Sequence, residues 1–324
     1  MLKDDFHAAC RLNHFSAKTE KTYWSFCKQF IIYHKKKHPA DLSKEHIEQF
    51  IKYLAVERKT SYATQNLAFN SLLFLYRKVI RKKFKLTKDY RVAKPQLLPT
   101  VLSHEEVIHI INLFEGVPKL ITELLYGCGM RKSEALSLRV NDVDLENKII
   151  YIRHAKGCKD RIAVIPGTLI PKLSDQIDKV KNLFEKDIRK KFNGVVLPES
   201  ILSKTPEASF ELQWQYLFPA KDLIKESRKR FHIHESTYDK ILKSIVTESG
   251  INKRISAHTF RHSFATHLLE KGYTLRLIQE LLGHKSITTT MVYTHVTQTQ
   301  IKDYVSPLDW QSKENPILKI YKIA

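Results

Sequence analysis

The chain has 324 residues, of which 43% are hydrophobic and 10% aromatic, a composition that can fill buried cores and excludes a disordered chain. Its length exceeds what one compact core usually serves, so two domains are the default expectation. Lysine and arginine number 55 against 34 acidic residues, and the formal charge of +21 favours a polyanion such as nucleic acid as the partner.

The first 80 or so residues are predicted to be helical. Ser16 is suited to cap a helix whose apolar residues are spaced by three and four. A second helix is expected to begin near Ser43, and a third to cover roughly 60–79. Each apolar stripe is most simply a core face, so residues 1–80 are expected to form one helical domain.

A basic, proline-punctuated segment follows over residues 81–99 and is predicted to link two domains. Within it, Lys82, Lys83 and Lys85 are candidates to contact DNA phosphates. The alternative is a tether that is merely solvated. We favour contact because the segment would join two lobes that each bind DNA.

Residues 100–324 are expected to form a second domain, mainly helical with a small sheet. Ser103 and Glu106 have the spacing of a capping box at its first helix. Strands are predicted at 148–154 and 161–166. Further helices are predicted around 119–126, 131–139, 170–191 and 237–249, with helical pattern dominant from 257 onward. The segment 141–144 is predicted to be a turn, and Lys156 to lie on the turn between the strands.

Six side chains in this second domain are suited to the cleavage of a phosphodiester. Two arginines can hold phosphate oxygens through planar, permanently charged forks. A lysine and two histidines can supply protons and hydrogen bonds, and a tyrosine hydroxyl can be the nucleophile. The six residues are Arg131, Lys156, His258, Arg261, His284 and Tyr293, in the segments Gly127–Glu134, Ala155–Gly157, His258–His262, Leu282–His284 and Tyr293–His295.

The local settings of these residues favour this chemistry but leave alternatives. Arg131 follows two glycines at a predicted helix start, where helix-end amides add to its charge, and His258 and Arg261 share a helix face. Glu134 could orient Arg131 or hydrogen-bond His258, or it could simply face solvent. Lys159 is a rival to Lys156, and His284 could merely cap a helix end.

No metal or other cofactor is predicted. Several histidines lie near the candidate set, but no His-Glu-x-x-His or matched Cys/His spacing accompanies them, and the flanking arginines would repel a cation. The cysteines, at positions 10, 27, 128 and 158, are too scattered for a zinc pair or a disulfide framework. With no signal peptide and no stretch of membrane-spanning length, a cytoplasmic, bacterial-type, nucleoid-associated protein is expected.

In order and context the six residues resemble the catalytic set of the tyrosine recombinases, the phage-integrase-type site-specific recombinases. The resemblance covers nearly the whole chain and implies a helical DNA-clamping domain followed by a mixed α/β catalytic domain. It also implies that the arginines and histidines bind and polarise the scissile phosphate. Tyr293 would attack it to form a 3′-phosphotyrosine while Lys156 protonates the 5′ oxygen, and a second 5′ hydroxyl would reverse the step without ATP.

Within that family the chain is most similar to the integron integrases. Tyr53–Lys59 and Thr64–Tyr76 resemble that subfamily's first domain, and an added segment at about 190–235 precedes His258. In integron integrases this region helps to recognise a folded single strand through extruded bases. The residues expected to contact DNA there are Trp214, Phe231 and His232 as stacking planes and Arg230 as a backbone contact. The alternative is a surface loop stapled by aromatic residues, and Phe231-His232 departs from the two adjacent histidines that relatives often carry.

The resemblance also implies a cyclic homotetramer on DNA, in which a tail at about 297–324 passes to a neighbouring protomer. Packing of the tail on its own domain is the alternative. The leading function is therefore insertion and excision of gene cassettes at folded single-strand attC sites, with double-stranded DNA as the other partner. The runner-up is a recombinase that acts on duplex sites for chromosome resolution or phage integration. A type IB topoisomerase and a non-catalytic, architectural DNA-binding protein are further alternatives.

Overall fold

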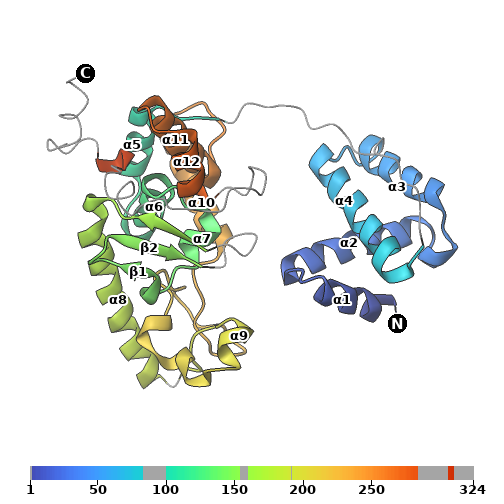
Figure 1. The fold of residues 1–324 in the computed structure, drawn as a ribbon, viewed down its shortest axis with the longest axis horizontal. Coiled ribbons are helices and arrows are strands. Elements are labelled where there is room, and N and C mark those ends of the chain that lie inside the picture. Colours follow the sequence, from blue (N-terminus) through green and yellow to red (C-terminus); the bar gives the residue numbers. More distant parts are fainter. Residues whose placement is uncertain (1, 83–99, 154–159, 191, 284–305, 310–324) are drawn as a thin grey trace. The chain divides into compact units, whose positions relative to one another are not determined.

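The computed structural model describes residues 2–82, 100–153, 160–190, 192–283 and 306–309 (Figure 1). The chain divides into two compact units, Met1–Leu98 and Pro99–Ala324, which we call the first and the second unit. Each has a hydrophobic core of its own. Within the described ranges, no helix combines the length and the apolar character that a membrane span requires.

The first unit is helical, as predicted. Its elements are α1 (Leu2–Leu12), α2 (Ala17–Tyr33), a 3-10 turn (Pro39–Asp41), α3 (Lys44–Val56), α4 (Tyr62–Phe74) and a π-helical turn (Leu75–Ile80). Ser16 caps α2 by accepting a hydrogen bond from the backbone of Thr19, at 3.2 Å. The single helix predicted over 60–79 instead widens into the π turn, which ends where Arg81 adopts a left-handed conformation with φ 59°.

Aromatic side chains form the centre of the first unit. Phe6, Phe30, Phe50 and Tyr76 are each at most 1% exposed. Phe30 meets Phe50 edge to face, with ring centroids 5.5 Å apart, a favourable arrangement for aromatic pairs. The Tyr76 hydroxyl donates to the carbonyl of Pro39 at 2.8 Å. The polar end of this buried ring is thereby satisfied, and the π turn is fastened to the 3-10 turn.

The second unit is mainly helical with a small antiparallel sheet, which confirms the predicted fold class. Its α-helices are α5 (His104–Leu113), α6 (Gly116–Gly127), α7 (Lys132–Leu136), α8 (Ile170–Arg189), α9 (Glu199–Leu202), α10 (Glu235–Glu248), α11 (Ala257–Glu270) and α12 (Leu275–Leu282). Short 3-10 turns lie at Val140–Asp142, Gly167–Leu169, Pro206–Phe210, Leu212–Trp214 and Pro307–Asp309. The predicted capping box of Ser103 and Glu106 is present at the start of α5.

The sheet has three strands in the order β1-β2-β3, all antiparallel. They are β1 (Val143–Asp144), β2 (Ile149–Ile152) and β3 (Arg161–Val164). In the register of the hairpin, Ile152 pairs with Arg161. The predicted turn at 141–144 is only partly right, because its last two residues form β1. The hairpin β2–β3 leads into residues 154–159, which lie outside the described residues.

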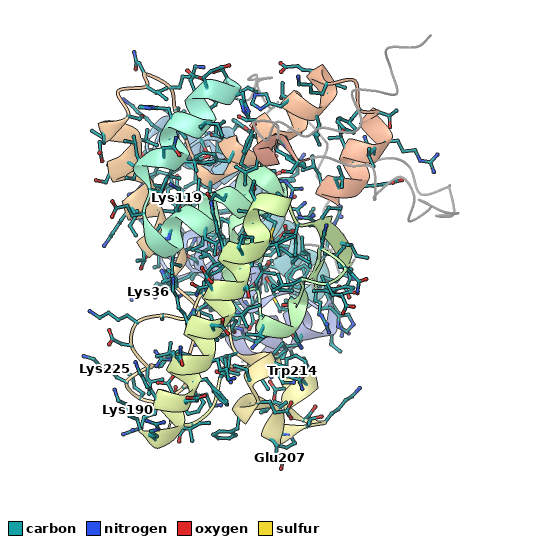
Figure 2. All side chains as sticks on the ribbon, turned by 90° about the vertical axis from the view of Figure 1, so that its left-hand side faces the viewer. Lys36, Lys119, Lys190, Glu207, Trp214 and Lys225 are labelled. Carbon is teal, nitrogen blue, oxygen red and sulfur yellow. The ribbon has the colours of Figure 1, made fainter. Side chains whose placement is uncertain are left out.

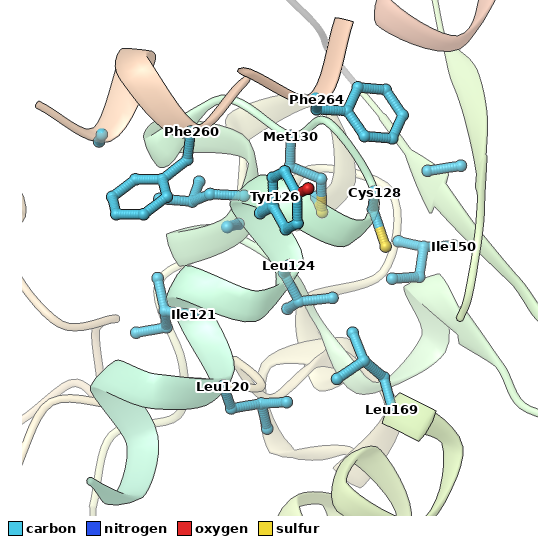
Figure 3. Packing of buried hydrophobic residues seen from close by; sticks show 14 of the residues in the cluster. Leu120, Ile121, Leu124, Tyr126, Cys128, Met130, Ile150, Leu169, Phe260 and Phe264 are labelled. Atoms are coloured by element: carbon cyan, nitrogen blue, oxygen red, sulfur yellow. The ribbon is translucent and has the colours of Figure 1, made fainter. Parts of the chain in front are cut away.

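Helix α6 is the centre of the second core. Leu120, Ile121 and Leu124 on this helix are at most 6% exposed. Figure 3 shows Phe260 of α11 above them and the sheet residue Ile150 to one side. Because packed cores resist small displacements, the position of α6 is fixed by both neighbours. The chain that leaves its C-terminal end therefore starts from a well-defined place.

Candidate active site

The segment that follows α6 leads directly to Arg131. Gly129 has φ +58°, and a Cβ at this position would lie 2.6 Å from the ring of Phe264. Only glycine fits such a backbone conformation and such a close approach without strain. After this turn Arg131 becomes the N-cap residue of α7, and its backbone N–H donates to Oε2 of Glu134 at 2.8 Å. The turn thus places a guanidinium at a helix start.

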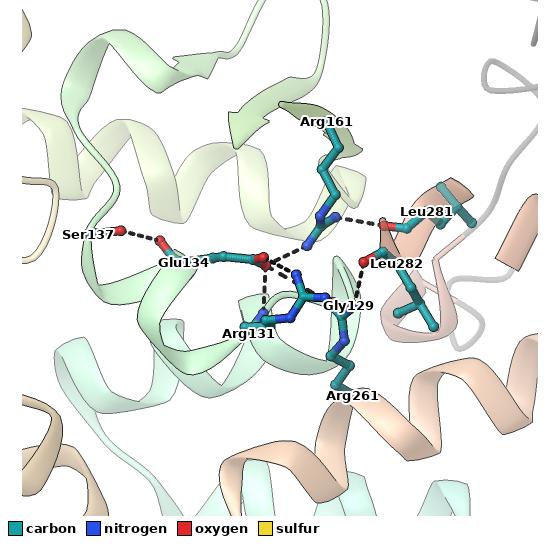
Figure 4. Close-up of polar contacts among 8 residues, drawn as sticks. All are labelled: Gly129, Arg131, Glu134, Ser137, Arg161, Arg261, Leu281 and Leu282. Carbon is teal, nitrogen blue, oxygen red and sulfur yellow. Dashed lines mark hydrogen bonds and ion pairs between the residues drawn. The ribbon is translucent and has the colours of Figure 1, made fainter. Parts of the chain in front are cut away.

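Glu134 lies among three arginines, as Figure 4 shows. Its carboxylate accepts hydrogen bonds from Nη1 of Arg131 at 2.5 Å and from Nη2 of Arg161 at 2.6 Å. Nη1 of Arg261 lies 3.8 Å from the same carboxylate. Burial alone would raise the pKa of Glu134, but Arg161 and the hydrogen bonds from Arg131 lower it below its ordinary value. Glu134 is therefore a fixed anion that orients Arg131.

Two guanidinium groups also cap the C-terminal end of α12. Nη1 of Arg161 donates to the carbonyl of Leu281 at 2.6 Å, and Arg261 donates to the carbonyl of Leu282. Arg261 further donates to the carbonyl of Gly129 at 2.5 Å. The last carbonyls of a helix have no partner within the helix, and cations are favourable there. The end of α12 is thereby attached to β3 and to α11.

Helix α11 contributes both His258 and Arg261. Burial, Arg131 and Arg161 lower the pKa of Arg261 to about 9, so its guanidinium remains charged at pH 7. His258 reaches solvent, yet partial desolvation, then its neighbour His262 and then Arg261 lower its pKa. The neutral imidazole that results at pH 7 can donate one hydrogen bond and accept another. This helix therefore supplies one cation and one group able to exchange a proton.

The structure brings four of the candidate residues together: Arg131, Glu134, His258 and Arg261. The other three catalytic candidates, Lys156, His284 and Tyr293, lie outside the described residues, as do Lys83 and Lys85. In the described ranges, no group of three or more His, Cys, Asp or Glu side chains is placed to hold a metal ion. The described cluster is therefore cationic, with one buried carboxylate, and suits an anion such as a phosphodiester.

Arg161 was not among the sequence candidates, which considered Lys156 and Lys159 shortly before it in the chain. A signal for it was present in the strand pattern. Successive residues of a strand alternate between faces, so Arg161 lies on the same face as Ala163, which is 2% exposed. An arginine on the buried face of a strand requires a partner, and here Glu134 and Leu281 provide it.

Arg230, which was predicted to contact DNA, takes part in a buried ion pair. It is 4% exposed and forms a two-point ion pair with Asp187, whose distances are 2.8 and 2.5 Å. Its remaining terminal nitrogen donates to the carbonyls of Ala220 and Lys221. All three nitrogens of this guanidinium are therefore engaged, partly with Asp187 of α8 and partly within the added segment at 190–235. A sequence shows the charge of Arg230 but not a partner that lies 43 residues away.

The three aromatic candidates in the added segment are half-buried, and Figure 2 shows Trp214 above Glu207 of the same segment. The ring of Tyr216 lies 5.5 Å from Phe231 and 5.1 Å from His232, edge to face in both cases. The guanidinium carbon of Arg139 lies 4.2 Å from the centroid of Tyr216 and 6.0 Å from that of Trp214. Cation–π contacts of this kind join Tyr216 and Trp214 through Arg139, and part of each candidate residue remains exposed.

Lys82, a predicted DNA contact at the start of the linker, lies within the described residues. Its ammonium donates to the carbonyls of Ala40 and Leu42, at 3.0 and 3.1 Å, and so lies along the first unit.

In the C-terminal tail, the hydroxyl of Ser306 donates to the carbonyl of Gly127 at 2.7 Å. The described part of the tail, 306–309, thus packs on its own unit, which is the alternative to exchange. Residues 310–324 lie outside the described residues.

Comparison with known proteins gives a consistent result. Residues 100–300 match the model of the phage integrase family, and residues 2–86 match that of the phage integrase N-terminal SAM-like domain. A protein of Escherichia coli named integrase/recombinase is 38% identical over 311 residues, which cover 94% of this chain and 92% of that protein. The tyrosine recombinase XerD of Oceanobacillus iheyensis is 34% identical over 215 residues, or 65% of this chain and 62% of that one.

Among solved structures, the recombinase XerH bound to its difH substrate has a similar fold. The TM-score is 0.57 at 21% identity, and the match covers 95% of this chain and 83% of that one. At this identity the likeness concerns the fold. It supports the same arrangement of a helical domain followed by a mainly helical domain with a small sheet.

Proposed function

Because this chain belongs to the phage integrase family, whose tyrosine recombinases cleave and rejoin DNA strands, we propose that it is an integron integrase. Its task would be to insert and excise gene cassettes at folded single-strand attC sites. The observation that carries this finer proposal is the aromatic cluster of the added segment, where Trp214, Phe231 and His232 are only half-buried. Stacking of an extruded base on one ring contributes about 1–3 kcal/mol.

In the proposed reaction the scissile phosphate lies between Arg131 and Arg261. Each guanidinium has five N–H donors, so the bonds to Glu134 and to backbone carbonyls leave others for phosphate oxygens. Because those bonds exist before DNA arrives, the two cations need little reorganisation in the transition state. The cluster therefore stabilises the negative charge that develops on the phosphate oxygens.

The remaining steps are assigned to the candidates outside the described residues. The hydroxyl oxygen of Tyr293 attacks phosphorus, the bond to the 5′ oxygen breaks, and Lys156 gives that oxygen a proton. His258 and His284 hydrogen-bond the phosphate. A 5′ hydroxyl of another strand then attacks the phosphotyrosine, which restores Tyr293 and conserves one phosphodiester per exchange. We expect four protomers to assemble on two paired sites.

A second candidate is a recombinase that acts on ordinary duplex sites. The observation that favours it is the 34% identity to a relative named XerD. Every described member of the cationic cluster serves both functions equally, because both use the same attack on phosphorus. The two functions differ in the form of DNA that is bound, so the substrate is the variable to test.

The test offers cassette-site DNA to the full chain in EDTA, once as a folded single strand and once as a duplex. A nick beside the cleavage point traps the covalent intermediate, which a denaturing gel separates from free DNA. We expect the adduct mainly on the folded strand, with none from Tyr293→Phe and normal amounts from Tyr151→Phe, a control at an exposed tyrosine of β2. An adduct mainly on duplex would support the second candidate. An adduct that survives Tyr293→Phe would overturn the nucleophile assignment.

A further inference from the structure

Arg161 joins three parts of the candidate site that are far apart in the sequence. It begins β3, shortly after Lys156 in the sequence. One terminal nitrogen donates to Glu134, 27 residues earlier, and the other to the carbonyl of Leu281, 120 residues later. Glu134 in turn holds the side chain and the backbone of Arg131. One buried guanidinium therefore bridges the start of α7 and the end of α12.

Gly283 leaves room for the side chain of Arg161 at the end of α12. A Cβ on Gly283 would lie 2.5 Å from Cδ of Arg161, and Gly283 has φ +61°. A side chain at residue 283 would therefore displace the arginine as well as strain the backbone. Gly283 immediately precedes His284. The path of Arg161 and the conformation of the residue before His284 are thus fixed by the same contact.

The hydrogen bonding of Arg161 indicates a role beyond stability. Its side chain is 6% exposed, and its Nε is buried without a hydrogen-bond acceptor among the residues that the structure describes. A buried donor without a partner is costly, and native proteins rarely keep one without a functional reason. An apolar side chain would fill this position of β3 at lower cost if packing were its only task.

We propose that Arg161 is a positioning residue. It orients Glu134 toward Arg131, and it holds the end of α12, which leads to His284. One side chain thereby aligns a phosphate-binding arginine and the backbone that precedes His284. The inference rests on the proposed roles of Arg131 and His284. It does not depend on whether the DNA is folded or duplex, because the alignment acts at the phosphate.

Electrostatics supply a readout that a purely structural role would not move. The charged and titratable groups facing Glu134 are Arg131 on its own element, Arg161 from β3, and Arg261 and His258 from α11. Arg161 is the foremost of those that lower the pKa of Glu134. Without it the carboxyl gains a proton at higher pH and releases Arg131. The acid limb of the pH–rate profile should then move to higher pH.

The test compares Arg161→Gln, Arg161→Lys and the control Arg276→Gln, which removes an arginine that is 66% exposed on α12. Single-turnover adduct formation is followed on whichever DNA form the wild type cleaves, and DNA affinity is measured at the same salt. For Arg161→Gln we expect a rate lower by about 100-fold, as a misplacement near 1 Å can cause, with affinity within about 3-fold and an acid limb at higher pH. Arg161→Lys should recover the acid limb but only part of the rate, because an ammonium does not reproduce the planar two-way bridge.

A double-mutant cycle with Glu134→Gln asks whether Arg161 acts through that carboxylate. The double variant should be slower than either single variant by much less than the product of their losses. Three outcomes would each overturn the proposal. The rate losses of the two single variants could multiply in the double variant. The rate of Arg161→Gln could stay within about 3-fold of wild type, or its affinity and its rate could fall equally.

Hydrogen exchange gives a second measurement that needs no DNA. In Arg161→Gln, amides of 131–136 and of 278–283 should exchange faster, while α6 and the first unit stay unchanged. Faster exchange confined to the hairpin would contradict the bridging role. A wild type that forms no adduct on either DNA would refute the proposed function, and the exchange pattern would still decide the role of Arg161.

Discussion

Tyr126 and His267 are joined by a buried hydrogen bond of 2.8 Å between the tyrosine hydroxyl and Nδ1 of the imidazole. Nε2 of His267 donates to the carbonyl of Leu102 at 2.9 Å, and a carbonyl can only accept. In the neutral ring Nδ1 is therefore the acceptor, and Tyr126 is the donor. The two bonds tie α11, the helix that carries His258, to α6 and to the start of the second unit.

Replacing Tyr126 with phenylalanine should destabilise the second unit without changing its shape. The buried Nδ1 of His267 loses its donor, and an unsatisfied buried acceptor costs about 1–3 kcal/mol. For a unit of this size, that corresponds to a decrease in Tm of roughly 2–12 °C. Calorimetry would check it, with Tyr151→Phe at an exposed tyrosine as the control. An unchanged Tm would show that the hydrogen bond from Tyr126 to His267 contributes nothing to stability.

Gly129→Ala should be much more harmful than Gly250→Ala. Both glycines have positive φ, +58° and +67°, so both variants incur the strain of a left-handed residue, about 1–2 kcal/mol. Only at Gly129 does the new Cβ meet the ring of Phe264, whereas nothing lies within 4 Å at Gly250. The difference in Tm isolates the clash. We also expect Gly129→Ala to slow adduct formation, because Arg131 would shift. Equal effects of the two variants would contradict the close approach.

Arg230→Ala should lower stability rather than weaken DNA binding selectively. It would leave Asp187 buried without its counter-charge, and breaking one side of a buried ion pair costs about 3–5 kcal/mol. Lys225→Ala, at an exposed lysine of the same segment, should stay within about 0.5 kcal/mol of wild type. Urea titrations measure both. If Arg230→Ala kept its stability and lost affinity for folded DNA alone, the DNA contact expected from the sequence would be supported instead.

Trp214→Ala should weaken the binding of folded single strands more than that of duplex. Loss of one stacked base corresponds to about 1–3 kcal/mol, or roughly 5- to 150-fold in affinity. Phe210→Ala is the matched control, because Phe210 is a 51% exposed aromatic residue of the same segment outside the Arg139 cluster. Titrations with both DNA forms at one salt concentration measure the ratio. Equal losses on both forms would remove the stacking role and leave the recombinase function intact.

The second unit should lose stability as the pH falls from 7 to 5. The pKa values of His258 and His262 are lowered in the folded chain, first by desolvation. The unfolded chain therefore binds protons at a higher pH than the folded chain, so stability falls as the pH drops below the ordinary histidine value of about 6.5. Urea midpoints at several pH values measure the slope, which should be smaller in the double variant His258→Asn, His262→Asn. An identical slope in that variant would assign the effect to other groups.

Local patterns in the sequence predicted the features that depend on near neighbours. The caps at Ser16 and Ser103, the helical first unit and the hairpin β2–β3 follow from spacing over a few residues. The contact of Glu134 with Arg131 is of the same kind, since three residues separate them. These are the interactions that helix geometry alone brings together.

The features that were missed depend on partners far along the chain. The burial of Arg161 depends on Glu134 and Leu281, and the ion pair of Arg230 depends on Asp187. No local pattern shows which of these partners an arginine will meet. The π turn at Leu75–Ile80 includes Tyr76, whose hydroxyl bonds to Pro39, 37 residues away. Periodicity gives the face of an element, whereas only the folded chain gives its partner.

The added segment is fastened to the second unit largely through its main chain. Arg139 donates to the carbonyls of Val196 and Trp214, and the side-chain amide of Gln176 on α8 donates to that of Leu217. A carbonyl is present whatever side chain its residue carries, so these attachments survive substitution at the anchor positions. Exposed residues of the segment can therefore diversify during evolution one at a time while the scaffold beneath them is inherited unchanged.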